Sequence, residues 1–397
     1  MSVEITSLAA RGDGVTEDGR YVPPAAPGDR LTDDGAVLAG PFRAVPPCRH
    51  FPTCGGCQLQ HIDEPTRAAF TAQRIEEALA AQGIAAPEIR TPHLSPPRSR
   101  RRASLRAERR GGQVIIGFNE QASYRIVDLA ECHILRPELF ALVAPLRPLL
   151  ADMIPERRAA DVQMTLTDQG VDLILSGVAA EGLQAHEALT AFAQAHHLAR
   201  ISIDDGLGPE TRWEPEGVTV TLGNVPVPFP PGAFLQATTD GEAALVAAVR
   251  EGVGEVRTVL DLFAGLGTFA LSLPAKVLAA EGARDAILAL KAAAGRSGKP
   301  VLTDHRDLFR RPYPAKDIGR FDAVVLDPPR AGAKEQSPEI AASGVARVVY
   351  VSCNPATFAR DAKALLASGY RLDWILPVGQ FRWSTHVELV GLFLKQA

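Results

Sequence analysis

A cysteine near the C-terminal end of the chain stands where an apolar strand should meet a helix. Residues 348–352 form a buried-strand pattern, and Asn354-Pro355 directly after Cys353 is typical of a helix that begins there. A thiol at a helix N-terminus has its thiolate stabilised, which makes it a stronger nucleophile at neutral pH. The alternative for a lone cysteine after a strand is a small buried filler, so its neighbours must decide.

Two carboxylates belong to other apolar runs of the same region. Asp327 directly follows the strand pattern 321–326. Because the carboxyl ends of parallel strands meet at one edge of the sheet, we expect Asp327 to lie beside Cys353. Glu388 lies within the apolar run 387–394, where burial would raise its pKa towards the range of a general base. The alternative for Glu388 is an exposed sheet edge.

A glycine-rich turn after another strand pattern predicts a nucleotide-like ligand. Residues 259–263 lead into Ala264-Gly265-Leu266-Gly267-Thr268, where glycines let the backbone approach a ligand closely. Ala270 replaces the third glycine of a dinucleotide fingerprint, and Asp261 suits a ligand with a positive end better than phosphates. Glu281 ends the next strand pattern, where a carboxylate can bind both hydroxyls of a ribose. The alternatives are an NAD-binding fold or a turn without ligand.

The remaining cysteines form a separate group. Cys48, Cys54 and Cys57 lie within ten residues of one another, and Cys132 lies further downstream. An odd total of five cysteines, in a chain without a secretion signal, argues against a disulfide framework. Four thiolates suit either an iron–sulfur cluster or a tetrahedral zinc ion, and the spacing leaves both possibilities open.

The composition is that of an ordinary soluble protein, with 46% hydrophobic and 22% charged residues among 397. The sequence has no apolar run long enough to span a membrane and no secretory signal pattern, so we expect a cytoplasmic protein. The net charge of −4 does not indicate nucleic-acid binding, but seven arginines lie between Arg98 and Arg110. Such a basic stripe is typical of phosphate contacts, and its alternative is a solvated strand face.

The chain divides into three predicted domains. Residues 1–46 are rich in Gly, Pro and Asp and suit a small β module. Residues 47–225 combine the clustered cysteines with a helix pattern over 64–81 and hairpin patterns such as 103–118, which favours an α+β domain. Residues 226–397 begin with a proline-rich extended segment and then alternate strands with helices. That alternation predicts an α/β domain with a parallel, doubly wound sheet.

Four motifs occur in order along the C-terminal part, at residues 231–236, 261–269, 327–332 and 350–361. Together they closely resemble the RNA uracil-5 methyltransferases, which implies a class I S-adenosylmethionine-dependent methyltransferase domain. Cys353 matches the nucleophile of that family and Glu388 its base. Thr268 stands where members commonly have asparagine. By position, the resemblance implies contacts to the methyl donor from Gln236, Phe263, Thr268, Glu281, Asp307 and Asp327, with Asp307 near the adenine.

The implied reaction needs both a nucleophile and a base. Carbon 5 of uracil is too weak a nucleophile to take a methyl group from a sulfonium directly. A thiolate that adds at carbon 6 makes carbon 5 nucleophilic. A base must then remove the proton from carbon 5 so that the thiolate can leave. We expect Cys353 and Glu388 to perform these two steps.

The N-terminal half carries a second resemblance. Cys48, Cys54, Cys57 and Cys132, with the string CGGCQLQH at 54–61, resemble the subgroup that holds a [4Fe-4S] cluster. The cluster-bearing relatives act on large-subunit ribosomal RNA, so the resemblance favours 23S rRNA as the substrate. Residues 1–46 resemble the RNA-binding TRAM module, notably in Ala26-Pro27-Gly28-Asp29, although the stretch is shorter than usual.

Three rival interpretations stay open: an RNA cytosine-5 methyltransferase, a non-catalytic RNA-binding iron–sulfur protein, and an enzyme that acts on tRNA. In each case RNA is the expected partner, with no membrane and no obligate protein partner. A target base inside folded RNA must be turned out to reach Cys353. We expect the arginines between Arg98 and Arg110, together with Phe234, to contact the RNA there.

Overall fold

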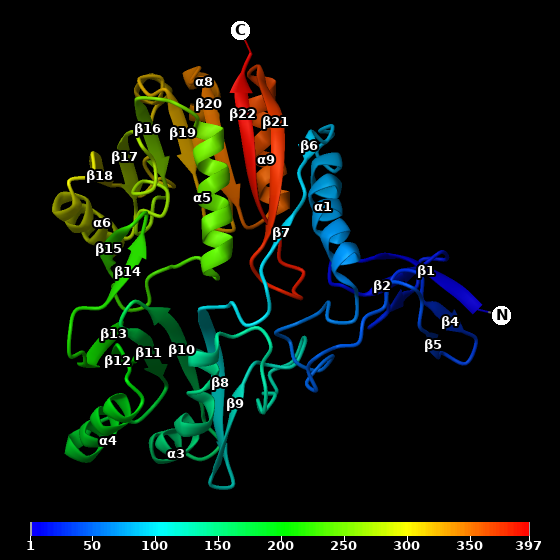
Figure 1. Ribbon diagram of the computed structural model, residues 1–397, viewed down its shortest axis with the longest axis vertical. Helices are drawn as coiled ribbons and strands as arrows, with labels where there is room; N and C mark the ends of the chain where they lie inside the picture. The colour runs from blue at the N-terminus through cyan, green and yellow to red at the C-terminus, as the bar shows by residue number, and fades with distance from the viewer. Residues whose placement is uncertain (1, 397) are drawn as a thin grey trace.

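A computed structural model describes residues 2–396. Figure 1 shows a large sheet with helices above a second, smaller sheet, and a small N-terminal sheet that projects to one side. The small sheet has the strand order β3-β2-β1-β4-β5. Its strands are β1 (Ser2–Leu8), β2 (Gly14–Thr16), β3 (Tyr21–Val22), β4 (Arg30–Thr32) and β5 (Val37–Leu38).

The buried carboxylate of Asp29 holds the turns of this small sheet together. It accepts hydrogen bonds from the backbone N–H groups of Ala26 (2.6 Å) and Gly40 (2.7 Å) and pairs with Arg43. These partners keep the pKa of Asp29 below its usual value although burial acts to raise it. This small sheet has few buried apolar side chains, and the hydrogen-bonded Asp29 carboxylate holds its turns in place.

Helix α1 (Glu64–Ala80) and the segment after it belong in space to the large sheet. Asp63 caps the helix by accepting the N–H of Thr66, and the buried side chains of Ile75 and Leu79 pack into the core of the large sheet. The chain then adds β6 (Glu88–Ile89) and β7 (His93–Leu94) in parallel beside β21. Part of the stretch 47–225 therefore packs with the C-terminal layer (Figure 1).

The second sheet has the order β13-β12-β11-β10-β8-β9, and only the β11–β12 pair is parallel. Its core contains the alternate residues Ala103, Leu105 and Ala107 of β8, which leaves the other face of that strand outward. Its elements are β8 (Arg102–Arg110), β9 (Gln113–Gly117), α2 (Pro137–Phe140), α3 (Val143–Met153), β10 (Ala159–Thr167), β11 (Gly170–Ser176), α4 (Gly182–Ala195), β12 (Arg200–Asp204) and β13 (Pro209–Trp213).

The large sheet has the order β18-β17-β16-β19-β20-β22-β21-β6. Neighbouring strands along the run β18-β17-β16-β19-β20 are parallel, whereas β22 is antiparallel to both of its neighbours, β20 and β21. The strands are β16 (Thr258–Leu262), β17 (Lys276–Glu281), β18 (Val301–His305), β19 (Ala323–Leu326), β20 (Arg347–Ser352), β21 (Tyr370–Gly379) and β22 (Glu388–Lys395). The helices are α5 (Thr239–Val253), α6 (Arg284–Ser297), α7 (Ala315–Ile318), α8 (Gln336–Ser343) and α9 (Pro355–Ala367). A hairpin of β14 (Thr219–Leu222) and β15 (Val225–Pro228) precedes them.

Both faces of the large sheet are buried, as the alternating pattern of strands and helices predicts. Along β20, Val349 and Val351 share a core with α5 and α6. Val348 and Tyr350 share the opposite core with α8, α9 and α1. The sheet therefore has helices on both faces, and its parallel strands end at one edge where a ligand can bind. The predicted doubly wound α/β architecture is confirmed.

Candidate active site

A cavity of about 870 Å³ opens at the carboxyl edge of the large sheet. Its walls come from the segment before α5, the glycine turn after β16, the ends of β17, β19 and β20, and the start of β22. Arg102 of β8 also reaches it from the second sheet. The cavity is therefore bounded by elements of both sheets.

The cavity brings together all but one of the candidate catalytic and donor-binding residues. The residues among them that line it are Gln236, Phe263, Thr268, Glu281, Asp327, Cys353 and Glu388. Asp307 is not part of the lining. Its carboxylate instead accepts the N–H of Phe309 at 3.0 Å, and the Phe309 ring contacts the Phe263 ring with centroids 5.5 Å apart.

The positions of Cys353 and Glu388 follow from strand register. Ser352, the last residue of β20, pairs with Leu389 of β22. Cys353 directly follows the first of these residues and Glu388 directly precedes the second, so both stand at the same end of this strand pair. Asn354 then caps α9 by accepting the N–H of Ala356, and Pro355 occupies the first turn. The predicted break between strand and helix is confirmed.

Burial and mutual repulsion control the protonation of these groups. Burial, with repulsion from Asp327, raises the pKa of Glu388 to about 8. Burial likewise raises the pKa of Asp327 to about 7. The pKa of Cys353 is also raised, by burial and by the nearby carboxylates Glu388 and Asp327. Burial and the two carboxylates therefore oppose the activation of the thiol that its place at a helix N-terminus predicts.

The glycine turn is shaped for close approach of a ligand. Gly267 has φ +96°, and a Cβ atom there would lie 2.4 Å from Cδ1 of Leu290. Phe263 has φ +61°, which is a strained conformation for an aromatic residue and directs this part of the chain at the cavity. Glu281 accepts the N–H groups of Gly265 (2.9 Å) and Ala283 (2.7 Å), which fixes its carboxylate beside the turn.

Beneath the turn, the carboxyl group of Asp261 is fully buried. Burial and repulsion from Asp327 and Glu281 raise the pKa of Asp261 well above its usual value, although a backbone hydrogen bond from Ala270 acts in the opposite direction. A buried carboxylate is costly to ionise, so this concentration of acids favours a ligand with a positive charge.

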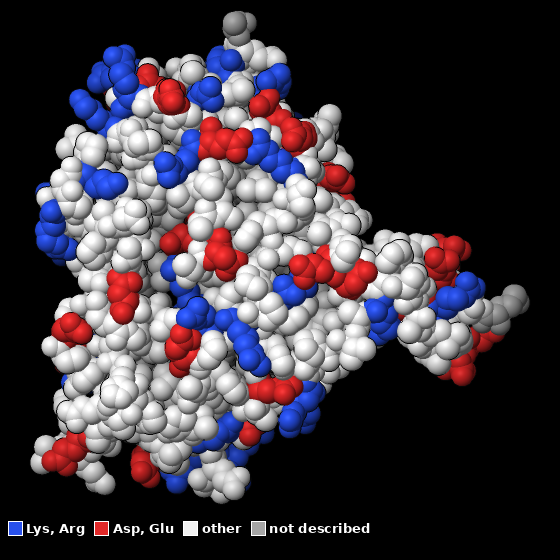
Figure 2. Space-filling view, in the orientation of Figure 1, with Lys and Arg blue, Asp and Glu red and all other residues white. Residues whose placement is uncertain are grey.

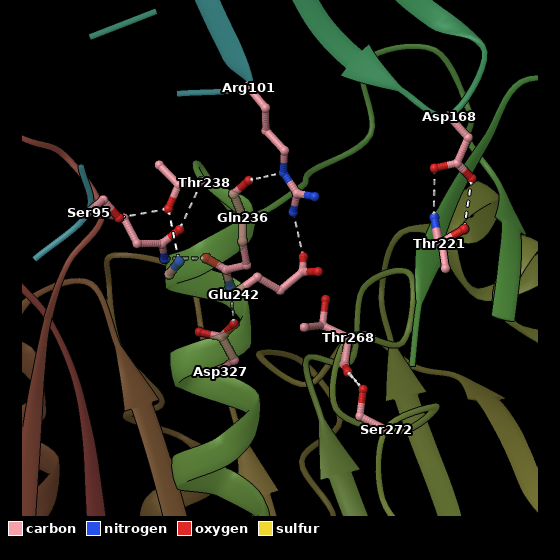
Figure 3. Close-up of polar contacts among 12 residues, drawn as sticks. Ser95, Arg101, Asp168, Thr221, Gln236, Thr238, Glu242, Thr268, Ser272 and Asp327 are labelled. Atoms are coloured by element: carbon pink, nitrogen blue, oxygen red, sulfur yellow. Dashed lines mark hydrogen bonds and ion pairs between the residues drawn. The ribbon is translucent and has the colours of Figure 1, made fainter. Parts of the chain in front are cut away.

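A chain of amides connects the two sides of the cavity, and reasoning from the sequence missed its central member, Gln380. Gln236 donates from Nε2 to Asp327 Oδ2 (3.3 Å), as Figure 3 shows. Gln380 donates from Nε2 to Gln236 Oε1 (2.8 Å) and also to Glu388 Oε2. The backbone N–H of Thr238 donates to Gln380 Oε1 (3.2 Å). Its position directly after the largely buried strand β21 is the sequence signal that could have indicated a buried role for Gln380.

The arginines between Arg98 and Arg110 are not a free basic stripe. Arg101 is buried, donates to the backbone oxygen of Gln236 (3.0 Å) and pairs with Glu242 (2.5 Å), as seen in Figure 3. Arg106 and Arg110 pair with carboxylates at 2.6 and 2.7 Å. Figure 2 shows acidic and basic side chains interspersed on the visible face. Most of this stripe is therefore neutralised within the protein.

Arg102 is the arginine of this group that lines the cavity. Its guanidinium lies over the ring of Phe234, 4.4 Å from the centroid, and no ion pair to it is formed among residues 2–396. Phe234 is 58% exposed, which leaves this large ring open to a partner at the mouth of the cavity. The pair offers an aromatic surface and a positive charge to a base or phosphate.

The four other cysteines converge on one small cavity beside the second sheet. Cys48, Cys54, Cys57 and Cys132 line it together with aromatic and aliphatic side chains such as Phe118. Burial raises the pKa of each thiol; repulsion from Glu131 adds to this at Cys48, and repulsion from neighbouring cysteines adds to it at Cys54, Cys57 and Cys132. Among residues 2–396, however, no group of His, Cys, Asp or Glu side chains is arranged to hold a metal ion. In the same range, no helix is long and apolar enough to cross a membrane.

The fold and the site define an α/β methyltransferase, and comparison with known proteins identifies its family. The model for tRNA (uracil-5-)-methyltransferases matches residues 301–397. An uncharacterized RNA methyltransferase of Zymomonas mobilis is 54% identical over 99% of both chains. A 23S rRNA (uracil(1939)-C(5))-methyltransferase of Thiobacillus denitrificans is 32% identical over 98% of this chain and 99% of its own. The protein belongs to the RNA uracil-5 methyltransferase family.

Solved structures agree with this assignment at the level of the fold. The tRNA (uracil-54, C5)-methyltransferase of Pyrococcus abyssi, in complex with S-adenosyl-L-homocysteine, superposes with a TM-score of 0.76. The match covers 99% of this chain and all of that one, at 24% sequence identity. The shared fold thus extends over the described length of the protein.

Proposed function

We propose that the protein transfers a methyl group from S-adenosylmethionine to carbon 5 of a uridine in RNA. The observation that carries the proposal is the meeting of Cys353 and Glu388 at one end of the β20–β22 pair, in a cavity with Asp327. A nucleophile and a proton acceptor on one rigid scaffold are what uracil-5 methylation requires.

The residues present suit the methyl donor. Glu281 and Asp327 line the cavity and Asp261 is buried beneath the glycine turn, and this group of acids favours a ligand with a positive charge, which a sulfonium carries. Glu281 would bind the ribose hydroxyls, while Gln236, Phe263 and Thr268 would contact the rest of the donor. Asp307 would order the loop that carries Phe309. When bound, the donor supplies an electrophilic methyl group.

The protein's own groups perform the remaining chemistry. The Cys353 group adds to carbon 6 of the uracil as the thiolate, after its proton has passed to solvent, and the electron pair of the C5–C6 double bond moves to the enolate. Carbon 5 then takes the methyl group and S-adenosylhomocysteine leaves. Glu388 removes the proton from carbon 5, the double bond reforms, and the C6–S bond breaks to release the Cys353 thiolate.

For the RNA, we propose 23S rRNA as the substrate, supported by the 32% identity to the 23S rRNA methyltransferase of Thiobacillus denitrificans. A tRNA substrate is the second candidate, because the matching family model and the P. abyssi enzyme both carry tRNA names. Residues 47–225 would form most of the RNA-facing domain beside the catalytic domain 226–397, with 1–46 as an accessory module. Arg102 and Phe234 would contact the everted nucleotide at the cavity mouth.

We further propose that Cys48, Cys54, Cys57 and Cys132 hold a [4Fe-4S] cluster. Their convergence on one cavity from two distant segments supports this. Directly after Cys57, the N–H groups of Gln58 and Leu59 both donate to the backbone oxygen of Trp383, at 2.7 and 2.8 Å. The cysteine loop thus supports the turn between β21 and β22, so a cluster there would stabilise the catalytic turn as a covalent cross-link does.

The cluster assignment has a direct test. Purification without oxygen should give a brown protein with four iron atoms per chain, and Cys57→Ala should lose both the iron and the colour. Cys353→Ala is the matched control and should keep them. One zinc ion per chain in place of iron would refute the cluster.

The function is tested by nucleoside mass spectrometry on ribosomal and transfer RNA. The samples come from wild-type cells, a deletion strain, and the deletion strain rescued with wild-type protein or with Cys353→Ala. Loss of one 5-methyluridine from 23S rRNA, restored only by the wild-type protein, is expected. Loss from tRNA would favour the second candidate, and unchanged 5-methyluridine in both RNAs would refute the uridine assignment. Loss of 5-methylcytidine would favour the cytosine enzyme instead.

A further inference from the structure

Gln380 occupies the space between the catalytic base and the donor-binding glutamine. Gln380 directly follows the last residue of β21 and is only 1% exposed. Both the donor and the acceptor end of its amide form hydrogen bonds. Nε2 donates to Glu388 Oε2 and to Gln236 Oε1, and Oε1 accepts the N–H of Thr238. An amide with both donors and its acceptor engaged has one orientation only.

The acceptor side of Gln380 is anchored to a rigid element. Thr238 is fully buried and caps α5, where its Oγ1 accepts the N–H of Gly241 at 3.1 Å. The same oxygen lies 2.9 Å from Oγ of Ser95 (Figure 3). The N–H that orients Gln380 thus belongs to a cap whose own position is fixed by contacts on two sides.

The first turn of α5 also leaves room for Gln380. A Cβ atom on Gly241 would lie 2.4 Å from Cγ and 2.9 Å from Cδ of Gln380. Gly241 has an ordinary helical backbone rather than a left-handed one, so conformational freedom does not explain the glycine. A Cβ atom there would also lie 2.7 Å from Thr238 Oγ1, so the glycine leaves room both for the Gln380 side chain and for the cap of α5.

We infer that Gln380 is a positioning residue, which holds the Glu388 carboxylate towards carbon 5 of the substrate and turns the Gln236 amide towards Asp327. Because Gln380 occupies Gln236 Oε1, the Nε2 of Gln236 faces Asp327. One side chain therefore sets the orientation of a group on the proton-removal side and of a group on the methyl-donor side. This inference rests on the proposed function and adds a residue to it.

Without Gln380, we expect proton removal to suffer more than covalent addition. Misplacing a catalytic group by about 1 Å can cost on the order of 100-fold in rate. The Cys353 sulfur is not bonded to Gln380, so addition at carbon 6 and methyl transfer should continue. The methylated, covalently bound RNA should then accumulate because its carbon 5 proton is removed slowly.

The test uses Gln380→Met, which keeps the side-chain length and removes all three hydrogen bonds. Purified full-length protein is incubated with 23S rRNA from a deletion strain and methyl-labelled S-adenosylmethionine. Labelled RNA that stays attached to the protein on a denaturing gel measures the adduct. We expect a fall in kcat of about 10- to 100-fold, with KM for the donor changed less, and a several-fold larger adduct fraction than in the wild type.

Gly241→Ala serves as the second variant, because its methyl group meets both Gln380 and the Thr238 cap that orients it, and so displaces Gln380 without deleting the amide. It should shift the adduct fraction in the same direction, and it decides the question if Gln380→Met fails to fold. Wild-type adduct fractions in the folded variants, with kcat either unchanged or lowered, would overturn the positioning role. If the wild-type protein itself methylates neither 23S rRNA nor tRNA, the proposed function fails instead, and the two failures are distinguished.

Discussion

Glu388 and Cys353 stand at the same end of the β20–β22 pair, one residue beyond the paired positions Leu389 and Ser352. The two groups come from strands that run in opposite directions, so the proposed nucleophile directly follows one strand while the proposed base begins the other. A paired sheet is among the most rigid scaffolds that a chain offers, which suits a site where two groups act in turn on adjacent carbons of one ring.

This relationship predicts separable defects in the two residues. Cys353→Ala should abolish both turnover and adduct, because no bond to carbon 6 can form. Glu388→Gln should lower turnover by roughly 100-fold or more yet accumulate methylated adduct, because only proton removal is blocked. Denaturing gels with methyl-labelled donor measure both. A Glu388→Gln variant with low turnover and no adduct would instead place Glu388 before the addition step.

The raised pKa of Glu388 predicts the pH dependence of turnover. As the proposed base, Glu388 must be deprotonated to act, and burial together with Asp327 raises its pKa to about 8. The thiol, whose pKa is also raised, likewise reacts as the anion. Under limiting substrate, kcat/KM should therefore rise from pH 6 to pH 9, because this parameter reports groups of the free protein. A rate that falls with pH over this range would contradict the assignment of Glu388 as base.

Asp327 should destabilise the fold at alkaline pH. Its pKa is raised to about 7 in the folded protein. The folded state therefore binds the proton more tightly than the unfolded state does. The resulting contribution to the free energy of unfolding is fully present below the pKa of the unfolded chain and is lost as the pH rises towards 7. One pKa unit corresponds to about 1.4 kcal/mol, and partial exposure reduces the effect. We expect Asp327→Asn to raise the free energy of unfolding by about 2 kcal/mol at pH 8 and by less at pH 5. Urea denaturation at both pH values checks this, and an equal gain at both would exclude ionisation as its cause.

Arg101 and Arg102 should give opposite kinds of defect although they are neighbours. Arg101 pairs with Glu242, and their side chains are only 10% and 12% exposed. Arg101→Ala leaves a buried carboxylate alone and should cost about 3–5 kcal/mol of stability. The double variant Arg101→Met with Glu242→Leu should recover most of that loss, as measured by urea denaturation. No recovery would mean that the bond from Arg101 to the Gln236 backbone dominates.

Arg102→Ala should instead weaken RNA binding with little loss of stability. Its guanidinium lies over exposed Phe234 at the cavity mouth, where it can meet a phosphate or a base. Loss of one phosphate contact should reduce the slope of log affinity against log salt by about one. Arg110→Ala is the matched control, because its guanidinium pairs with Glu108 away from the cavity. Unchanged affinity and salt slope in Arg102→Ala would remove it from the RNA surface.

Local patterns in the sequence determined much of the catalytic scaffold. The apolar runs and the following Asn-Pro place Cys353 between β20 and α9, and the hairpin patterns correspond to β8–β9 and β10–β11. These features are readable because strand and helix periodicity, caps and glycine turns depend on residues close together in the chain. The family resemblance then gave the chemistry to these positions.

Only the tertiary structure decided the partners of the polar groups. Gln236 and Gln380 are 144 residues apart and Arg101 and Glu242 are 141 apart, so no local pattern announces either contact. Arg101 and Arg102 share one composition signal, but they make contacts with different parts of the molecule: one pairs in the interior and the other lines the cavity. The environment of the Cys353 thiol was likewise decided by the tertiary structure. Its place at a helix start predicted activation, while the surrounding burial and carboxylates, which depend on long-range packing, raise its pKa instead.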